Sequence, residues 1–154
     1  MTMILPVTED DVPMLAAIHE DAFGLHAWSA AMLADSLKNQ DVWGVKLLAD
    51  YGALGFALCQ QTGEDCEILT FAVLPARQHR GHGQRLLQAV IESAQVRQSS
   101  QILLEVAADN RAARKFYDFA GFFRTGERPG YYPRPAGAIS AILMALKLPE
   151  RREA

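Results

Sequence analysis

Two cysteines are all that this chain of 154 residues contains, and their spacing does not resemble that of metal ligands. We interpret Cys59 and Cys66 as free thiols of the core, which is typical of a cytoplasmic protein. No apolar run reaches the ~18 residues that a membrane span needs. The first residues also lack the basic segment and apolar core of a signal peptide. The sequence therefore predicts a cytoplasmic protein with no metal site and no membrane contact.

The chain also lacks a large excess of either sign of charge. The formal net charge is −3, so we expect no attraction for nucleic acid. The composition, with 50% hydrophobic and 21% charged residues, is that of a globular rather than a disordered chain. A chain of this length suits one domain with a core of its own. Residues 1–154 are therefore expected to form a single domain.

A basic loop with two glycines lies between an apolar strand and an amphipathic helix, from about Phe71 to Leu87. The first turn of a helix has N–H groups without intrahelical partners, and glycine lets an anion approach them closely. The loop lacks the Lys-Ser/Thr of a P-loop and the third glycine of a dinucleotide fingerprint. It predicts a different phosphate-binding loop, Gln78-x-x-Gly81-x-Gly83. The positive charges expected around it are those of Arg77, Arg80 and Arg85.

Hydrophobic periodicity predicts the order strand, two helices, three strands, helix, strand, helix and two strands, in a mixed α/β domain. The strands are expected at residues 3–6, 42–49, 53–61, 66–74 and 101–106, from 122 onward, and at 139–148. Thr8 and Ser29 are expected to cap the first two helices, and Met32, Leu33 and Leu37 to face the core. Three prolines and two glycines between residues 129 and 137 predict a loop.

Four segments together resemble the GNAT family of N-acetyltransferases. They are Ile68-Leu-Thr-Phe-Ala-Val73 followed by Pro75, Gln78-His-Arg-Gly-His-Gly83, Leu104-Glu-Val106 followed by Asn110, and Lys115-Phe-Tyr117 running into Gly121. Within the family they are most similar to the bacterial enzymes that acetylate a ribosomal-protein N-terminus. The resemblance implies a single α/β domain whose mixed, mostly antiparallel sheet is flanked by helices. It also implies a parallel strand pair splayed at the acetyl-CoA site.

The resemblance further implies a role for each matched residue, with acetyl-CoA as co-substrate. Glu105 resembles the general base, and Tyr117 resembles the general acid that protonates the departing thiolate. The implied cofactor residues are Phe71, Ala72 and Val73 for the pantetheine arm, His79, Arg80, Gly81, His82, Gly83 and Gln84 for the pyrophosphate, and Asn110.

Each of these residues also has a plainer interpretation. Glu105 is an outward-facing strand residue in that case, and Tyr117 a core residue beside a phenylalanine. Asn110 is then only a helix cap, a role that is compatible with cofactor contact. The side chains of His79 and His82 are then solvated, and only their amides bind.

The acceptor implied by the resemblance is a peptide or protein N-terminus, such as that of a ribosomal protein. An α-amine, with a pKa near ~8, is easier to deprotonate than a lysine at ~10.4, which suits a carboxylate base. Two alternatives stay open, namely acetylation of a small-molecule amine and a non-catalytic acyl-CoA-binding protein. We expect a monomer or weak dimer.

Overall fold

The computed structural model describes residues 1–75 and 81–149, and their elements follow the order predicted from the sequence. In chain order these are β1 (Thr2–Pro6), η1 (Glu9–Asp11), α1 (Val12–Phe23), η2 (Gly24–His26), α2 (Ala30–Lys38), β2 (Val42–Ala49), β3 (Gly52–Thr62), β4 (Asp65–Val73), α3 (His82–Val96), β5 (Gln101–Ala107), α4 (Arg111–Phe119), β6 (Phe123–Tyr132) and β7 (Ile139–Lys147), where η marks a short 3-10 helix.

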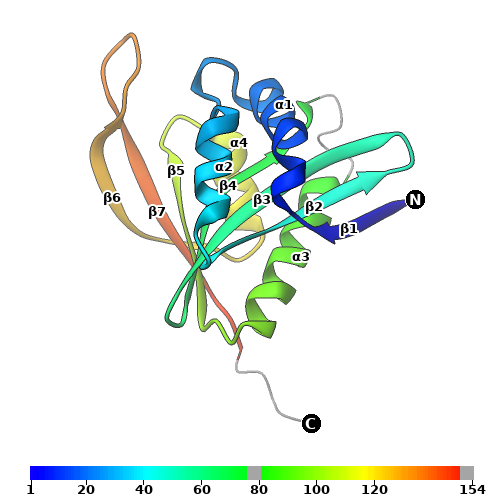
Figure 1. Cartoon of the computed structure of the whole chain (residues 1–154). Coiled ribbons are helices and arrows are strands. Elements are labelled where there is room, and N and C mark those ends of the chain that lie inside the picture. Colours follow the sequence, from blue (N-terminus) through cyan, green and yellow to red (C-terminus); the bar gives the residue numbers. More distant parts are fainter. Residues whose placement is uncertain (76–80, 150–154) are drawn as a thin grey trace.

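The strands of the described residues join one seven-stranded sheet in the order β1-β2-β3-β4-β5-β7-β6 (Figure 1). Neighbouring strands are antiparallel, except that β4 and β5 run parallel. A parallel pair needs a crossover connection, and the segment that contains α3 supplies it. The predicted mixed, mostly antiparallel sheet with one parallel pair is confirmed.

The two parallel strands soon part. Their ladder ends at Glu67 on β4 and Leu103 on β5, although β4 continues to Val73 and β5 to Ala107. Beyond Glu67 and Leu103 the two strands are therefore no longer paired with each other. This divergence is the splay that the family resemblance implied.

A β-bulge at Leu69 lies just past the point where the parallel strands part. Ile68 pairs with Cys59 and Thr70 pairs with Leu58, so Leu69 is an extra residue on β4. An extra residue reverses the alternation of side chains along a strand. Residues 71 and 73 consequently pack on the same face of the sheet as residues 66 and 68.

Helix starts follow the capping signals of the sequence. The backbone N–H of Thr8 donates to Oδ2 of Asp11 at 2.8 Å, and Nζ of Lys46 donates to both oxygens of the same carboxylate. At the start of α2, the Ser29 hydroxyl accepts from the N–H of Met32 at 3.2 Å. The predicted cap at Ser29 is confirmed and contributes about 1 kcal/mol to α2. Thr8 is the N-cap of η1, which leads into α1, whereas the residue at the N-cap of α1 itself is Asp11.

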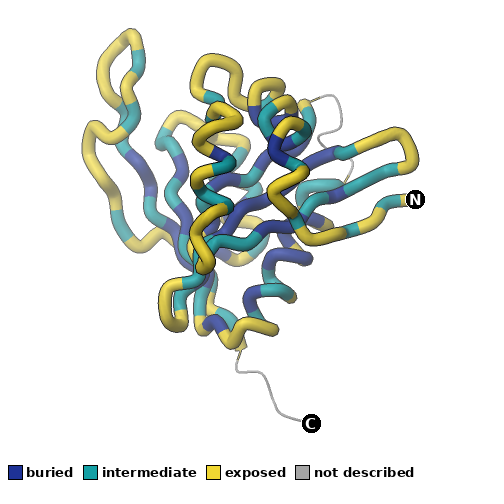
Figure 2. Tube along the Cα trace, in the orientation of Figure 1, coloured by how far each residue is buried: buried dark blue, intermediate teal, exposed yellow. Residues whose placement is uncertain are grey.

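Helices cover both faces of the sheet. α3 and α4 pack on one face, where Leu86 and Leu104 are buried. α1 and α2 pack on the other, where Leu33 meets the fully buried Phe56. Figure 2 shows the buried residues concentrated along the central strands. Each large apolar side chain buried in this way contributes about 1.5–3 kcal/mol to the stability of the fold. The helices do not cover the ends of the strands, where a site can form.

Two expectations from the sequence are wrong. The loop predicted at residues 129–137 begins later, because β6 includes Pro129 and runs to Tyr132. β6 is an edge strand whose pairing with β7 is irregular between Arg128 and Tyr132, which is where a sheet tolerates proline. Met32 is 51% exposed and does not face the core, whereas its neighbour Leu33 does.

Both cysteines are free and fully buried, which confirms their interpretation as core thiols. The hydrogen bond that the Cys59 thiol donates to Cys66, followed in importance by burial, raises the pKa of Cys59. In residues 1–75 and 81–149, no helix has both the length and the apolar character to cross a membrane. In the same ranges, no group of three or more His, Cys, Asp or Glu side chains could hold a metal ion.

Candidate active site

A cavity of about 570 Å³ lies beside the last residues of β4, beyond the point where this strand leaves β5. β4, α3, α4 and the end of α1 all contribute to its wall. Eight of its lining residues are ones that the resemblance implied, namely Phe71, Ala72, Val73, Gly81, Gly83, Gln84, Asn110 and Tyr117. The others, which sequence reasoning did not assign to the site, are Ala22, Phe23, Ala112, Ala113 and Phe116.

The start of α3 forms one end of this cavity. Gly81 precedes the helix with φ +79°, a left-handed conformation that glycine adopts without steric cost. A Cβ on Gly83 would lie 3.2 Å from Cε1 of Phe116, so glycine lets α3 approach α4 closely. The N–H groups of this first turn have no helical acceptors, as an anion-binding site requires. His82 is the first residue of α3, but its side chain does not line the cavity.

Not all the predicted basic residues of the loop can be placed. His79 and Arg80, together with Arg77, lie outside the described residues. Arg85 is described, and the expectation that it adds charge to the loop is wrong. Its guanidinium donates to the carbonyl oxygen of Thr2 on β1 at 3.0 Å, so it ties the helix to the edge of the sheet.

Asn110 caps α4 and also lines the cavity. Its Oδ1 accepts from the backbone N–H of Ala113 at 3.1 Å, which confirms the interpretation as a helix cap. The cap uses the side-chain oxygen and leaves the two amide N–H donors for another acceptor. Cofactor contact by Asn110 stays a prediction, and the cap is compatible with it.

Tyr117 projects from α4 into an aromatic cluster and lines the cavity. Its ring stands edge-on to Phe116, Phe122 and Phe71, at centroid distances of 5.2, 5.3 and 6.1 Å. The residue is 7% exposed. Burial, and to a smaller extent the Cys59 thiol, raises the pKa of Tyr117 above its ordinary value. The phenol is therefore protonated at neutral pH and can donate a proton.

Glu105 lies on the opposite face of the sheet from Tyr117. Its neighbours Leu104 and Val106 are buried in the same cluster as Tyr117, and strand alternation turns Glu105 the other way. The Glu105 side chain is 21% exposed and forms an ion pair with Arg128, whose Nε lies 2.9 Å from Oε1 of the carboxylate. The carboxylate does not line the cavity. The two predicted catalytic side chains thus lie on opposite sides of the sheet, Glu105 on β5 and Tyr117 on α4.

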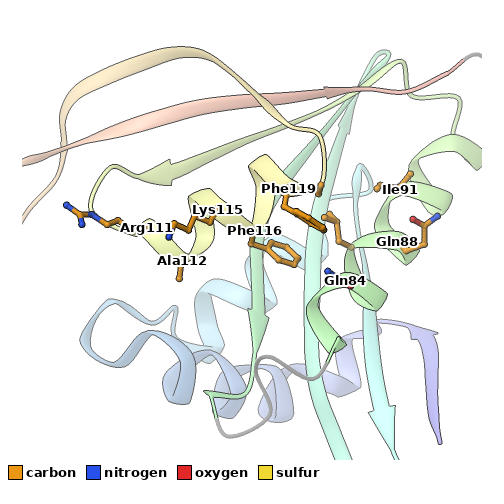
Figure 3. Close-up of a pocket in the computed structure, with 10 residues that line it drawn as sticks. Gln84, Gln88, Ile91, Arg111, Ala112, Lys115, Phe116 and Phe119 are labelled. Carbon is orange, nitrogen blue, oxygen red and sulfur yellow. The ribbon is translucent and has the colours of Figure 1, made fainter.

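A larger cavity of about 760 Å³ lies between α3 and α4 (Figure 3). Gln88 and Ile91 of α3 line it together with Lys115 and Phe119 of α4. It adjoins the first cavity, and Gln84 and two residues of α4 line both. Only Gln84 among its lining residues was expected at the site. The smaller cavity is therefore the candidate active site despite its size.

Sequence reasoning missed His19, which is buried beside the site. The N–H of Trp28 donates to its Nδ1 at 3.0 Å, so Nε2 carries the proton and donates to Oγ1 of Thr70 at 2.8 Å. Burial lowers the pKa of His19 to about 4, which keeps the ring neutral. The imidazole thereby fixes the linker between α1 and α2 against β4. The available signal was its position, because His19 lies on the apolar, inward-facing stripe of α1 together with Leu15.

Comparison with known proteins identifies the class. The model of the acetyltransferase (GNAT) family matches residues 12–122, and the chain belongs to this family. It is a GNAT N-acetyltransferase, an enzyme of a family that uses acetyl-CoA as co-substrate.

Among its relatives are [ribosomal protein bS18]-alanine N-acetyltransferases. The enzyme of Haemophilus ducreyi is 36% identical, over 95% of this chain and 100% of its own. That of Salmonella typhimurium is 31% identical, over 96% and 99%. The crystal structure of the ribosomal-protein-S18-alanine N-acetyltransferase from Escherichia coli superposes with a TM-score of 0.91 at 29% identity, over 99% of this chain and 97% of that one.

Proposed function

We propose that this enzyme acetylates the α-amine of the N-terminal alanine of ribosomal protein bS18. One observation carries the proposal, namely that the likeness to the bS18-alanine enzymes extends beyond the family segment. The family model ends at residue 122, whereas the likeness to the relatives continues through β6 and β7. These strands border Glu105, which pairs with Leu143 on β7 and with Arg128 on β6, and an acceptor would approach there.

The smaller cavity suits acetyl-CoA. The backbone at Gly81 and Gly83 is open to a pyrophosphate, because neither residue has a Cβ and the first turn of α3 offers N–H groups. The edge of β4 at Phe71 can pair with the pantetheine arm as an added strand would. Asn110 can donate to a carbonyl of that arm. When bound, acetyl-CoA supplies an acetyl group activated as a thioester.

Glu105 is proposed as the base that removes the proton from the acceptor amine. An α-amine with a pKa near ~8 is partly neutral at pH 7.5, so a carboxylate acting directly or through water is an adequate base. Tyr117 is proposed as the acid for the departing thiolate, because its buried phenol is protonated at neutral pH. Since these two side chains lie on opposite sides of the sheet, the acceptor and the acetyl donor would meet between β4 and β5 from those two sides.

A thiol-release assay tests the proposal with a peptide that carries the N-terminal sequence of bS18. Glu105→Gln and Tyr117→Phe are each expected to lower kcat by about 10²–10⁴-fold and to leave the Kd of acetyl-CoA nearly unchanged. Glu127→Gln serves as the control, because this carboxylate pairs with Arg124 on the exposed edge strand. Turnover close to wild type in both site variants would refute the roles of Glu105 and Tyr117.

The acceptor is tested separately by a panel of amines. Selective turnover of the alanine peptide, with a free α-amine required, is the expected result. Turnover of small-molecule amines alone would refute the ribosomal target and keep the acetyltransferase chemistry. Binding of acetyl-CoA with no transfer to any amine would favour an acyl-CoA-binding protein instead.

A further inference from the structure

The ion pair between Arg128 and Glu105 spans β7. Arg128 on β6 pairs with Ala141 on β7, and Ala141 pairs with Ala107 on β5. Cross-strand partners point to the same face of a sheet, and Glu105 shares that face with Ala107 because they are two residues apart. A side chain as small as alanine on β7 leaves room for the arginine to reach over it. Arg128 therefore meets the Glu105 carboxylate on the face of the sheet opposite Tyr117.

The guanidinium lies on the solvent side of the carboxylate. The Arg128 side chain is 57% exposed, whereas that of Glu105 is 21% exposed. Their contact is through Nε, and the Arg128 Cζ also lies 5.5 Å from the centroid of the Tyr131 ring. A cation that is exposed, and has an aromatic face close by, can leave its partner at low cost.

The other charged or titratable groups around Glu105 belong to β6 and to the residues that follow it. Tyr132 on β6 is near enough for the Glu105 charge to add to the effect of burial, which raises the pKa of the phenol. Arg134 is already paired with Asp109 at 3.0 Å. Leu143, the partner of Glu105 on β7, is apolar. Among the described residues, Arg128 is thus the cation paired with this carboxylate, and an acceptor ammonium would compete with it.

We propose that Arg128 is a positioning residue that holds Glu105 in the empty enzyme and is displaced from it by the α-ammonium of the acceptor. The exchange replaces one cation by another, so the partly buried carboxylate is never left unpaired. An N-terminus that carries no charge cannot make this exchange. The inference rests on the proposed role of Glu105 as the base.

Steady-state kinetics with Arg128→Gln test the exchange. Removal of the competing cation is expected to lower the KM of the alanine peptide by about threefold to tenfold, with the KM of acetyl-CoA unchanged. Arg124→Gln is the matched control, because this arginine on the same strand pairs with Glu127. A KM that is unchanged, or raised, by Arg128→Gln would overturn the proposal.

Two further comparisons separate displacement from ordinary peptide contact. The inhibition constant of the N-acetylated product peptide should be the same for wild type and Arg128→Gln, because this peptide has no ammonium group. In calorimetry, Arg128→Gln should add nothing to the peptide affinity of Glu105→Gln, because the partner of Arg128 is already lost. Equal shifts for the free and the acetylated peptide would show that Arg128 contacts the peptide itself, which overturns the exchange.

An NMR measurement keeps the inference testable if the proposed function fails. The Nε–H resonance of Arg128, assigned by its loss in Arg128→Gln, should shift when the alanine peptide is added and stay unchanged with the acetylated peptide. Absence of the shift would refute the exchange even in an active enzyme. Presence of the shift, with no turnover of any peptide, would refute the proposed substrate and support the exchange.

Discussion

Protonation of His19 should destabilise the enzyme in mild acid. Burial lowers the pKa of this histidine from 6.5 to about 4. Between these pH values the ring is protonated in the unfolded chain and neutral in the folded chain. Stability therefore rises with pH across this window and is lost as pH falls through it. A drop of about 2.5 units corresponds to about 3 kcal/mol in full. The side chain is 2% exposed, so water screens little of this effect.

Urea unfolding at a series of pH values from 7.5 to 4 measures the effect. His19→Asn is the informative variant, because its Oδ1 can still accept from the N–H of Trp28 while the titrating ring is gone. We expect it to be about 2 kcal/mol less stable at pH 7, from the lost ring packing and the lost bond to Thr70. Its stability should then depend less steeply on pH than that of wild type.

His26→Asn provides the control, because His26 is an exposed residue of η2 close to the same linker. This variant should keep the wild-type pH dependence. An equally steep loss of stability in His19→Asn and in wild type would refute the reasoning, since the acid sensitivity would then come from other groups.

Two further predictions concern the cap of the first helix and the start of α3. Asp11→Asn should cost about 2 kcal/mol in urea unfolding, because Lys46, which is bound to both carboxylate oxygens at 2.8 and 2.9 Å, loses its charged partner; equal stability would contradict this. Gly83→Ala should raise the Kd of acetyl-CoA several-fold in calorimetry, because the new Cβ presses on Phe116 and moves the first turn of α3. An unchanged Kd would show that the turn does not hold the cofactor.

Local features of the fold could be predicted from the sequence because their causes are local. The caps at Thr8 and Ser29 depend on residues three positions apart. The left-handed conformation of Gly81 before α3 also has a local cause, because glycine adopts this conformation without steric cost. Hydrophobic periodicity predicted the order of strands and helices, and the family resemblance implied the mixed sheet with one parallel pair.

Contacts between distant segments could not be predicted in this way. The direction of Arg85 depends on the position of β1, which lies 83 residues away in the chain. Pro129 reads as a loop residue until β6 is known to be the edge of the sheet. The partner of Glu105 is likewise set by the register of three strands, in which Arg128 crosses β7 beside an alanine. No spacing along the chain encodes that register.

The bulge at Leu69 links both sides of the proposed reaction. It sets which face each later residue of β4 occupies, so that Thr70 turns toward α1 and accepts from His19, while Phe71 turns toward α4 and lines the cavity. Adjacent residues of one strand thus hold the linker between α1 and α2, through His19, and form one wall of the candidate cofactor cavity. At this point β4 is also no longer paired with β5. One inserted residue, placed where the parallel ladder ends, therefore sets which side chains of β4 face each of the two sides from which the proposed reaction partners would approach.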